Sequence, residues 1–137
     1  MPRLIIDPYK DFNRCYQRLK SEYEKYDRLI IAVDFDDTVY NTHNNEGWCY
    51  LGVMQTLLRW KDNAEIICWT ASTPDRYELI RSVFNAFGIT LSGINCNAPG
   101  IEDRGPKIYA NIYLDDRTFG LAEGLKALTM LADVKGL

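Results

Sequence analysis

The chain has 137 residues, of which 47% are hydrophobic, and a formal net charge of −3. A chain of this length buries roughly two thirds of the surface that it exposes when unfolded, which is enough for one core and no second domain. No apolar run approaches the roughly 18 residues of a membrane span, and the basic residues are scattered. We therefore expect a cytoplasmic protein without a membrane partner, which meets nucleic acid only as a substrate.

The first predicted element is a helix that begins at Asp7 and Pro8, in an N-terminal part that covers residues 1–28. Its apolar residues recur every three or four positions and form one stripe: Phe12, Tyr16, Leu19, Tyr23 and Tyr26. We expect this stripe to pack on a sheet. Aromatic stripes also form dimer faces, so a homodimer is the alternative.

Alternating strands and helices follow. Apolar runs predict strands at 29–33, 64–69, 89–94 and 110–114. Helical periodicity predicts a helix over 48–61, whose inward-facing residues are Leu51, Met54 and Leu58. A second helix passes through Tyr77, Ile80, Phe84 and Phe87 and stops at Gly88, and a last one carries Leu121, Leu125 and Leu128.

This alternation predicts an α/β fold, a Rossmann-like three-layer sandwich with a mostly parallel central sheet. We expect a single domain over residues 1–137, with a motif-bearing core at 29–116 and a C-terminal helical segment at 117–137. The stretches 39–47 and 95–106 are predicted to be loops. The four cysteines are widely spaced, which indicates neither a zinc site nor a disulfide framework.

Polar side chains stand where the predicted strands end. Asp34-Phe35-Asp36-Asp37-Thr38 follows the first strand, Thr70-Ala71-Ser72 the second, and Asp115-Asp116 the last, with Lys107 a few residues upstream. In open α/β sheets ligands bind outside the carboxyl ends of the strands. Ser72 or Thr73, followed by Pro74, is expected to cap the next helix.

Five aspartates in these motifs cannot all lie close together in the ionised state without a cation, because like charges disfavour each other's ionisation. Oxygen donors suit Mg²⁺, and the chain offers no soft-ligand pattern of recognisable spacing. The sequence therefore predicts a Mg²⁺ cofactor.

The order of the motifs, from Leu29 to Asp116, resembles that of the haloacid dehalogenase superfamily of aspartyl-phosphate-forming hydrolases. The resemblance implies that Asp34 is the nucleophile and that Asp36 is the general acid and base, which requires a raised pKa. It implies a hydroxyl donor in Thr70 and a stabilising charge in Lys107. The one departure is Asp37, where many members carry Gly.

The resemblance also implies the metal ligands and the shape of the site. The ligands would be the Asp34 carboxylate, the Asp36 main-chain carbonyl and Asp115, with Asp116 in or just outside the shell. Members often insert a cap domain at one of two positions, and both hold only short loops here. The expected site therefore has no cap, and it is either open to bulky substrates or closed by a partner subunit.

The predicted function is Mg²⁺-dependent hydrolysis of a phosphate monoester, on a small molecule or a macromolecular end. Expected substrate contacts are Thr70, Ala71, Lys107, His43 and Arg76, with Trp48 a further candidate at the mouth. Two alternatives are a receiver-like signalling domain that is phosphorylated on Asp and a catalytically idle binding protein. The position of Lys107 before the last Asp pair argues against a receiver domain, and the complete set of motif residues argues against an idle scaffold.

Overall fold

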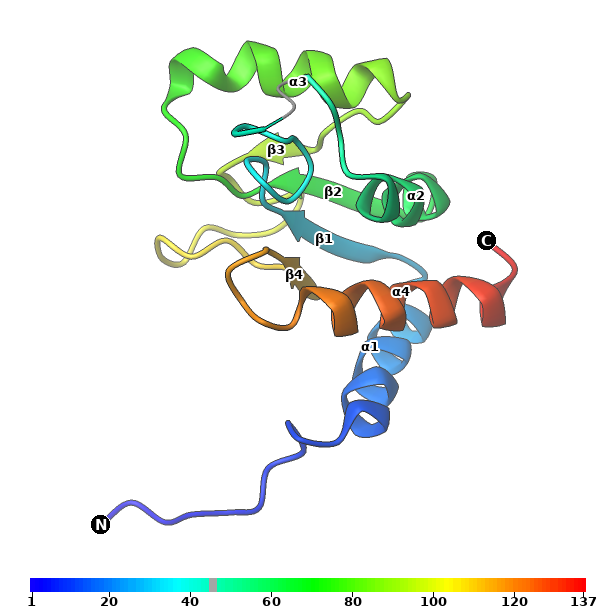
Figure 1. Cartoon of the computed structure of the whole chain (residues 1–137). Helices are drawn as coiled ribbons and strands as arrows, with labels where there is room; N and C mark the ends of the chain where they lie inside the picture. The colour runs from blue at the N-terminus through cyan, green and yellow to red at the C-terminus, as the bar shows by residue number, and fades with distance from the viewer. Residues whose placement is uncertain (45–46) are drawn as a thin grey trace.

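The computed structural model describes residues 1–44 and 47–137 of the chain. Its centre is a parallel sheet with the strand order β3-β2-β1-β4 (Figure 1). The strands are β1 (Leu29–Val33), β2 (Ala64–Cys68), β3 (Gly93–Ile94) and β4 (Ile112–Leu114). Helices flank the sheet, which confirms the predicted α/β fold of the Rossmann-like, three-layer type.

The helices are α1 (Phe12–Tyr26), α2 (Leu51–Trp60), α3 (Tyr77–Ala86) and α4 (Leu121–Lys135), with a short 3-10 turn, η1 (Pro74–Arg76), before α3. The prediction that the first helix begins at Asp7 and Pro8 is wrong. Asp11 is the N-cap, because its side chain accepts a hydrogen bond from the Arg14 N–H and leaves the preceding residues outside the helix. Those residues extend away from the body of the protein (Figure 1).

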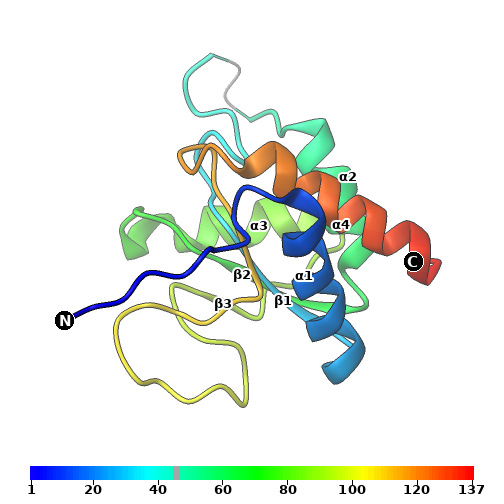
Figure 2. The same ribbon diagram turned by 90° about the horizontal axis from the view of Figure 1, so that it is seen from below.

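The two faces of the sheet are covered differently. Residues of β1 and β2 on one face pack against all four α-helices in the main core. The opposite face presents Ile30, Ala32 and Ile67, and these pack against Ala98 and Ile108 from the segment between β3 and β4. Figure 2 shows this segment on the side of the sheet away from α2 and α4. The third layer is therefore built by an irregular segment instead of a helix.

Several predicted details are corrected by the packing. Leu51 is 71% exposed instead of inward-facing, and Val53 is buried in its place. The predicted strands at 89–94 and 110–114 shrink to β3 and β4. At the start of β4 the Asn111 side chain, instead of a backbone carbonyl, accepts the Ile30 N–H at 2.6 Å, so the regular ladder begins one residue later.

The aromatic stripe of α1 packs inward, as expected for its middle part. Tyr16, Leu19 and Tyr23 are buried, whereas Tyr26 is 61% exposed. Tyr23 meets Trp60 edge to face, with ring centroids 5.3 Å apart. The central members of the stripe are thus used within the chain and are not available as a dimer face.

The two positions at which a cap domain would be inserted carry short segments. In the first, Tyr40 forms isolated bridges with Asp36 and Cys49, and residues 45 and 46 of the predicted loop lie outside the described residues. The second holds the irregular segment over 95–111. None of the helices in the described parts of the chain is long and apolar enough to cross a membrane.

A first prediction concerns Asn111, which is 7% exposed and joins the start of β1 to that of β4. Replacing it with Ala leaves the Ile30 N–H buried without an acceptor, and we expect a loss of about 2 kcal/mol in the free energy of unfolding. Urea denaturation of N111A measures the loss. N85A, at an exposed position on α3, is the control and should change stability by less than about 0.5 kcal/mol. Equal stability of the two variants would contradict the bridging role.

Candidate active site

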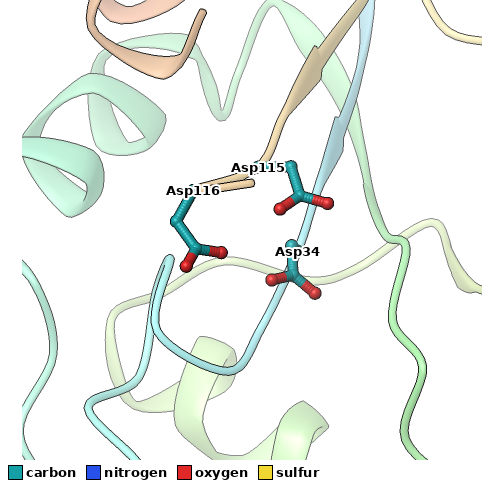
Figure 3. Close-up of side chains that lie close together, drawn as sticks. All are labelled: Asp34, Asp115 and Asp116. Atoms are coloured by element: carbon teal, nitrogen blue, oxygen red, sulfur yellow. The ribbon is translucent and has the colours of Figure 1, made fainter. Parts of the chain in front are cut away.

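Three carboxylates meet at the carboxyl edge of the sheet. Val33 at the end of β1 is paired with Leu114 at the end of β4, so the residues that follow each strand become neighbours. One oxygen from each of Asp34, Asp115 and Asp116 lies within 4.8 Å of the others. Figure 3 shows these side chains side by side at the ends of the two strands. The pairing of β1 with β4 therefore creates the cluster.

The pKa of Asp34 is raised to about 6, first by partial burial of its carboxylate and then by the charge of Asp115. Hydrogen bonds from the Phe35 N–H and from Thr38 oppose the rise without cancelling it. Asp34 forms no ion pair with a side chain in residues 1–44 and 47–137, and a bound cation would supply the countercharge.

The donor set suits a hard divalent cation. All the donors are carboxylate oxygens, which Mg²⁺ and Ca²⁺ prefer. Oxygens on opposite sides of an octahedral Mg²⁺ are about 4.2 Å apart, so a spread of up to 4.8 Å fits Mg²⁺ after small side-chain adjustments. Asp34, Asp115 and Asp116 are therefore the residues that could hold the metal.

The buried Thr38 side chain contacts two of the three carboxylates. It is 1% exposed, and its hydroxyl lies 3.2 Å from an Asp34 oxygen and 3.1 Å from an Asp116 oxygen. The same hydroxyl accepts the Asp116 N–H at 3.0 Å. Since one hydroxyl carries a single hydrogen, it can donate to only one carboxylate at a time. Sequence reasoning did not assign Thr38 a role, although it closes the Asp-x-Asp-x-Thr motif.

The Asp36 carboxylate is not part of this cluster and is paired with Arg76. The two terminal nitrogens of the Arg76 guanidinium donate to its two oxygens at 2.7 and 3.0 Å. Thr42 donates at 2.6 Å and Ser72 at 3.1 Å. Asp36 thus joins the segment after β1 to the segment after β2.

These contacts overturn one prediction and decide another. The pKa of Asp36 is lowered, first by the hydrogen bond from Arg76, whereas a raised pKa was expected. Of the two residues predicted to cap the next helix, Thr73 stands at the N-cap of η1, without a side-chain cap bond, while the Ser72 hydroxyl donates to Asp36. Pro74 does occupy the first turn, as predicted.

Asp37, which stands where many members of the resembling family carry Gly, has the backbone conformation that favours Gly. Its φ is +62°, in the left-handed region that Gly adopts freely and Asp tolerates better than most residues. Its carboxylate accepts the Thr42 N–H at 3.3 Å and lies 3.0 Å from His43 Nε2. The five aspartates of the motifs therefore divide into a group of three, one paired with Arg76 and one beside His43.

Thr70 lies one residue beyond the Trp69 that follows β2, and Asn95 holds its backbone. The Thr70 N–H donates to Asn95 Oδ1 at 2.7 Å, and Asn95 Nδ2 donates to the Thr70 carbonyl at 2.8 Å. The Thr70 hydroxyl accepts the Ser72 N–H at 3.0 Å, which leaves its own hydrogen free to donate elsewhere. Ala71 is exposed. Nothing in the local sequence around Asn95 singles it out.

Lys107 stands apart from the three carboxylates. Its ammonium lies 5.0 Å from the centre of the Tyr113 ring and is exposed. Side chains alternate between the faces of a strand, so Asp34 continues the face of Ile30 and Ala32, which is also the face of Tyr113. Lys107 and Asp34 therefore share one face of the sheet. The remaining candidates at the mouth, His43 and Trp48, are both strongly exposed.

No model of a protein family matches the sequence, and no curated protein matches it significantly. A solved structure similar to this one is that of a conserved protein from Bacteroides thetaiotaomicron, with a TM-score of 0.59 and 21% sequence identity. The match covers 80% of this chain and 90% of that one. At this level of identity the likeness shows the fold alone.

The raised pKa of Asp34 has a consequence for stability. A carboxyl whose pKa is higher in the folded state than in the unfolded state lowers stability as the pH rises from about 4 through about 6, because the folded state then holds a disfavoured charge. The raised pKa implies a destabilisation that solvent screening reduces, because Asp34 is partly exposed. We therefore expect D34N in chelator to be more stable than the parent by about 1 kcal/mol in the free energy of unfolding at pH 7.5.

This difference should shrink toward zero at pH 4, where the folded parent has Asp34 protonated. Urea denaturation at the two pH values measures it. D62N, at an exposed position, is the matched control. A D34N variant no more stable than the parent at pH 7.5 would show that the Asp34 charge is not destabilising.

Thr38 provides a test of the cluster as a metal site. T38V removes the hydroxyl that holds Asp34 and Asp116 while keeping the volume of the side chain, and groups that orient ligands are worth about 10-fold or more in metal affinity. We expect the Mg²⁺ dissociation constant to rise about 10-fold in calorimetric titration. T38S retains the hydroxyl and should bind within about threefold of the parent. Unchanged affinity in T38V would remove Thr38 from this role.

Proposed function

We propose that the protein is a Mg²⁺-dependent hydrolase of phosphate monoesters that works through an aspartyl phosphate on Asp34, as its resemblance to the haloacid dehalogenase superfamily implies. The observation that carries the proposal is the gathering of Asp34, Asp115 and Asp116 at the carboxyl edge of a parallel sheet. We place the protein in the cytoplasm. Its substrate is a phosphorylated small molecule or macromolecular end, which reaches the site without passing a cap domain.

Asp34 supplies the nucleophile. One carboxylate oxygen attacks phosphorus, and the bond from phosphorus to the ester oxygen breaks. Thr38 keeps the Asp34 carboxylate oriented through the 3.2 Å hydrogen bond. A bound Mg²⁺ would neutralise the carboxylates and the developing charge on the phosphoryl oxygens.

Asp36 handles the protons. It gives a proton to the departing alkoxide, and in the second half-reaction it takes a proton from the water that attacks the phosphorylated Asp34. Inorganic phosphate then leaves and Asp34 is restored. For this work the Asp36 carboxylate has to separate from Arg76 and take up a proton from solvent before the first turnover, since the ion pair holds it ionised. Arg76 would then be free to bind a phosphoryl oxygen.

Two further side chains complete the proposal. The Thr70 hydroxyl donates to a phosphoryl oxygen, for which its hydrogen is free. Lys107 shares the sheet face of Asp34, and its long exposed side chain would turn toward the phosphoryl group to offset its charge. Ala71 and His43 would border the substrate at the mouth.

The ion pair between Asp36 and Arg76 favours one other candidate function. If the pair persists when the site is phosphorylated, Asp36 cannot activate water, and phospho-Asp34 would accumulate as in a receiver-like signalling domain. The two functions differ in the lifetime of the same acyl phosphate. Measurement of that lifetime separates them.

The experiment is a turnover screen over phosphate esters with Mg²⁺, combined with acid quenching to trap phosphorylated protein. We expect continuous release of phosphate, at least about 10³-fold slower in D34N because the nucleophile is lost, and none in excess chelator. D62N, an exposed Asp, should keep the parent rate.

Three results would count against phosphatase activity. Full turnover in D34N would remove the aspartyl-phosphate route, and full turnover in chelator would remove the metal. Stoichiometric phosphoprotein without release of phosphate would replace the phosphatase with the receiver-like function.

A further inference from the structure

A pocket with a volume of about 660 Å³ lies on the sheet face that no helix covers. Its walls are the end of α1, the start of β1 and residues 97–109 of the irregular segment, and Ile30 belongs to its lining. This volume is in the range of small-ligand sites, about 300 to 1,000 Å³.

The pocket is separate from the carboxylate cluster. Tyr26 and Arg28, which precede β1, line it, whereas Asp34 follows the other end of that strand. From Ile30 to Asp34 the strand advances about 13 Å, at about 3.3 Å per residue. A small molecule in this pocket would therefore not touch the Asp34 carboxylate.

The charges around the pocket favour an anion. Three cationic side chains line it, those of Arg28, Arg104 and Lys107. Arg28 is paired with Glu65 at 2.7 Å and Arg104 with Glu102 at 3.2 Å, so one positive charge is left without a partner in the part of the chain that the structure describes. Lys107 has no carboxylate within 4.0 Å among residues 1–44 and 47–137. This basic concavity stands out on a chain whose net charge is −3.

The pocket also offers surface for a flat or apolar group. Tyr26 and Tyr109, residues that are 61% and 47% exposed, line it, and Ile30 and Ile101 add apolar surface. Two hydrogen bonds hold Tyr109: its N–H donates to Asn97 at 2.7 Å, and its hydroxyl accepts from Asn111 at 3.3 Å. Exposed aromatic rings that are held in place can stack on a planar partner.

The segment that forms one wall is irregular and is anchored on the sheet at both ends. It runs from β3 to β4 without helix or strand, over residues 95–111. Ala98 and Ile108 are buried on the sheet and anchor the two ends, while the residues between them are largely exposed and form the wall. Irregular segments longer than about 15 residues in compact domains are usually functional or disordered, and this one is anchored on the sheet at both ends.

We propose that this pocket is a second ligand site, distinct from the carboxylate cluster, for a small organic anion that joins a planar or apolar body to a phosphate or carboxylate group. The cations bind the anionic group, and Lys107 takes part only when it is not turned toward a phosphoryl group at Asp34. The tyrosine rings and the two isoleucines receive the body.

The test is an NMR titration of the full chain in chelator, so that no phosphate ester is hydrolysed. The probes are adenosine 5′-monophosphate and 1-naphthyl phosphate, which carry both features, and adenosine and inorganic phosphate, which each carry one. We expect at least one two-feature probe to shift the amides of Ile30 and Tyr109, with a dissociation constant at least 10-fold below those of the one-feature probes.

Variants then locate the binding. R104Q and Y109A should each weaken the two-feature probe by about 10-fold, since each removes one of the two recognised features. R81Q, which removes an exposed Arg on α3, and D34N should bind as the parent does. Shifts confined to Phe35 and Thr38, or no binding of either two-feature probe, would overturn the proposal.

Discussion

The parallel pairing of β1 with β4 is the constraint on which the carboxyl edge depends. It aligns Val33 with Leu114, so the acidic residues that follow the two strands must share one small space. Burial and mutual repulsion raise the pKa of Asp34, and the sheet cannot relieve this by moving one strand without losing the ladder. The core of the protein thus holds charges together that would separate in a flexible chain, and a divalent cation would resolve the conflict.

Charge compensation divides the remaining aspartates. Arg76 neutralises Asp36, and the pair connects the segments that follow β1 and β2. Asp37 turns toward His43, away from the group of three. The rim of the site is therefore held by the Asp36–Arg76 ion pair and the Asp37–His43 contact, and the ion pair also favours the ionised form of Asp36. In the proposed reaction, the arrival of an anionic substrate would compete with Asp36 for Arg76, which couples binding to the release of the acid and base.

The sheet is covered by helices on one face and by an irregular segment on the other. Burial of Ala98 and Ile108 on that second face is enough to close the core. The segment touches the sheet mainly at its two anchored ends. A pocket is left between them, in the space that a crossover helix would have filled. The carboxylate cluster and this pocket lie toward opposite ends of β1, which lets one small domain present two sites of opposite charge.

The sequence alone determined the α/β fold, the parallel sheet and the strand ends at which acidic residues stand, because apolar runs and helical periodicity are local properties. It also indicated that clustered carboxylates need a cation. Element boundaries depended on tertiary partners: the Asn111 side chain delays the β4 ladder, and the Asp11 cap shortens α1.

Only the tertiary structure decided which aspartates share a site. Asp34 and Asp36 are two residues apart, yet one faces Asp115 and the other Arg76, which follows a different strand. Thr38 and Ser72 acquired their contacts in the same way, across distances in sequence that no local pattern spans. The sequence shows which side chains carry charge, but the packing of the sheet decides which neighbour raises or lowers the pKa of each.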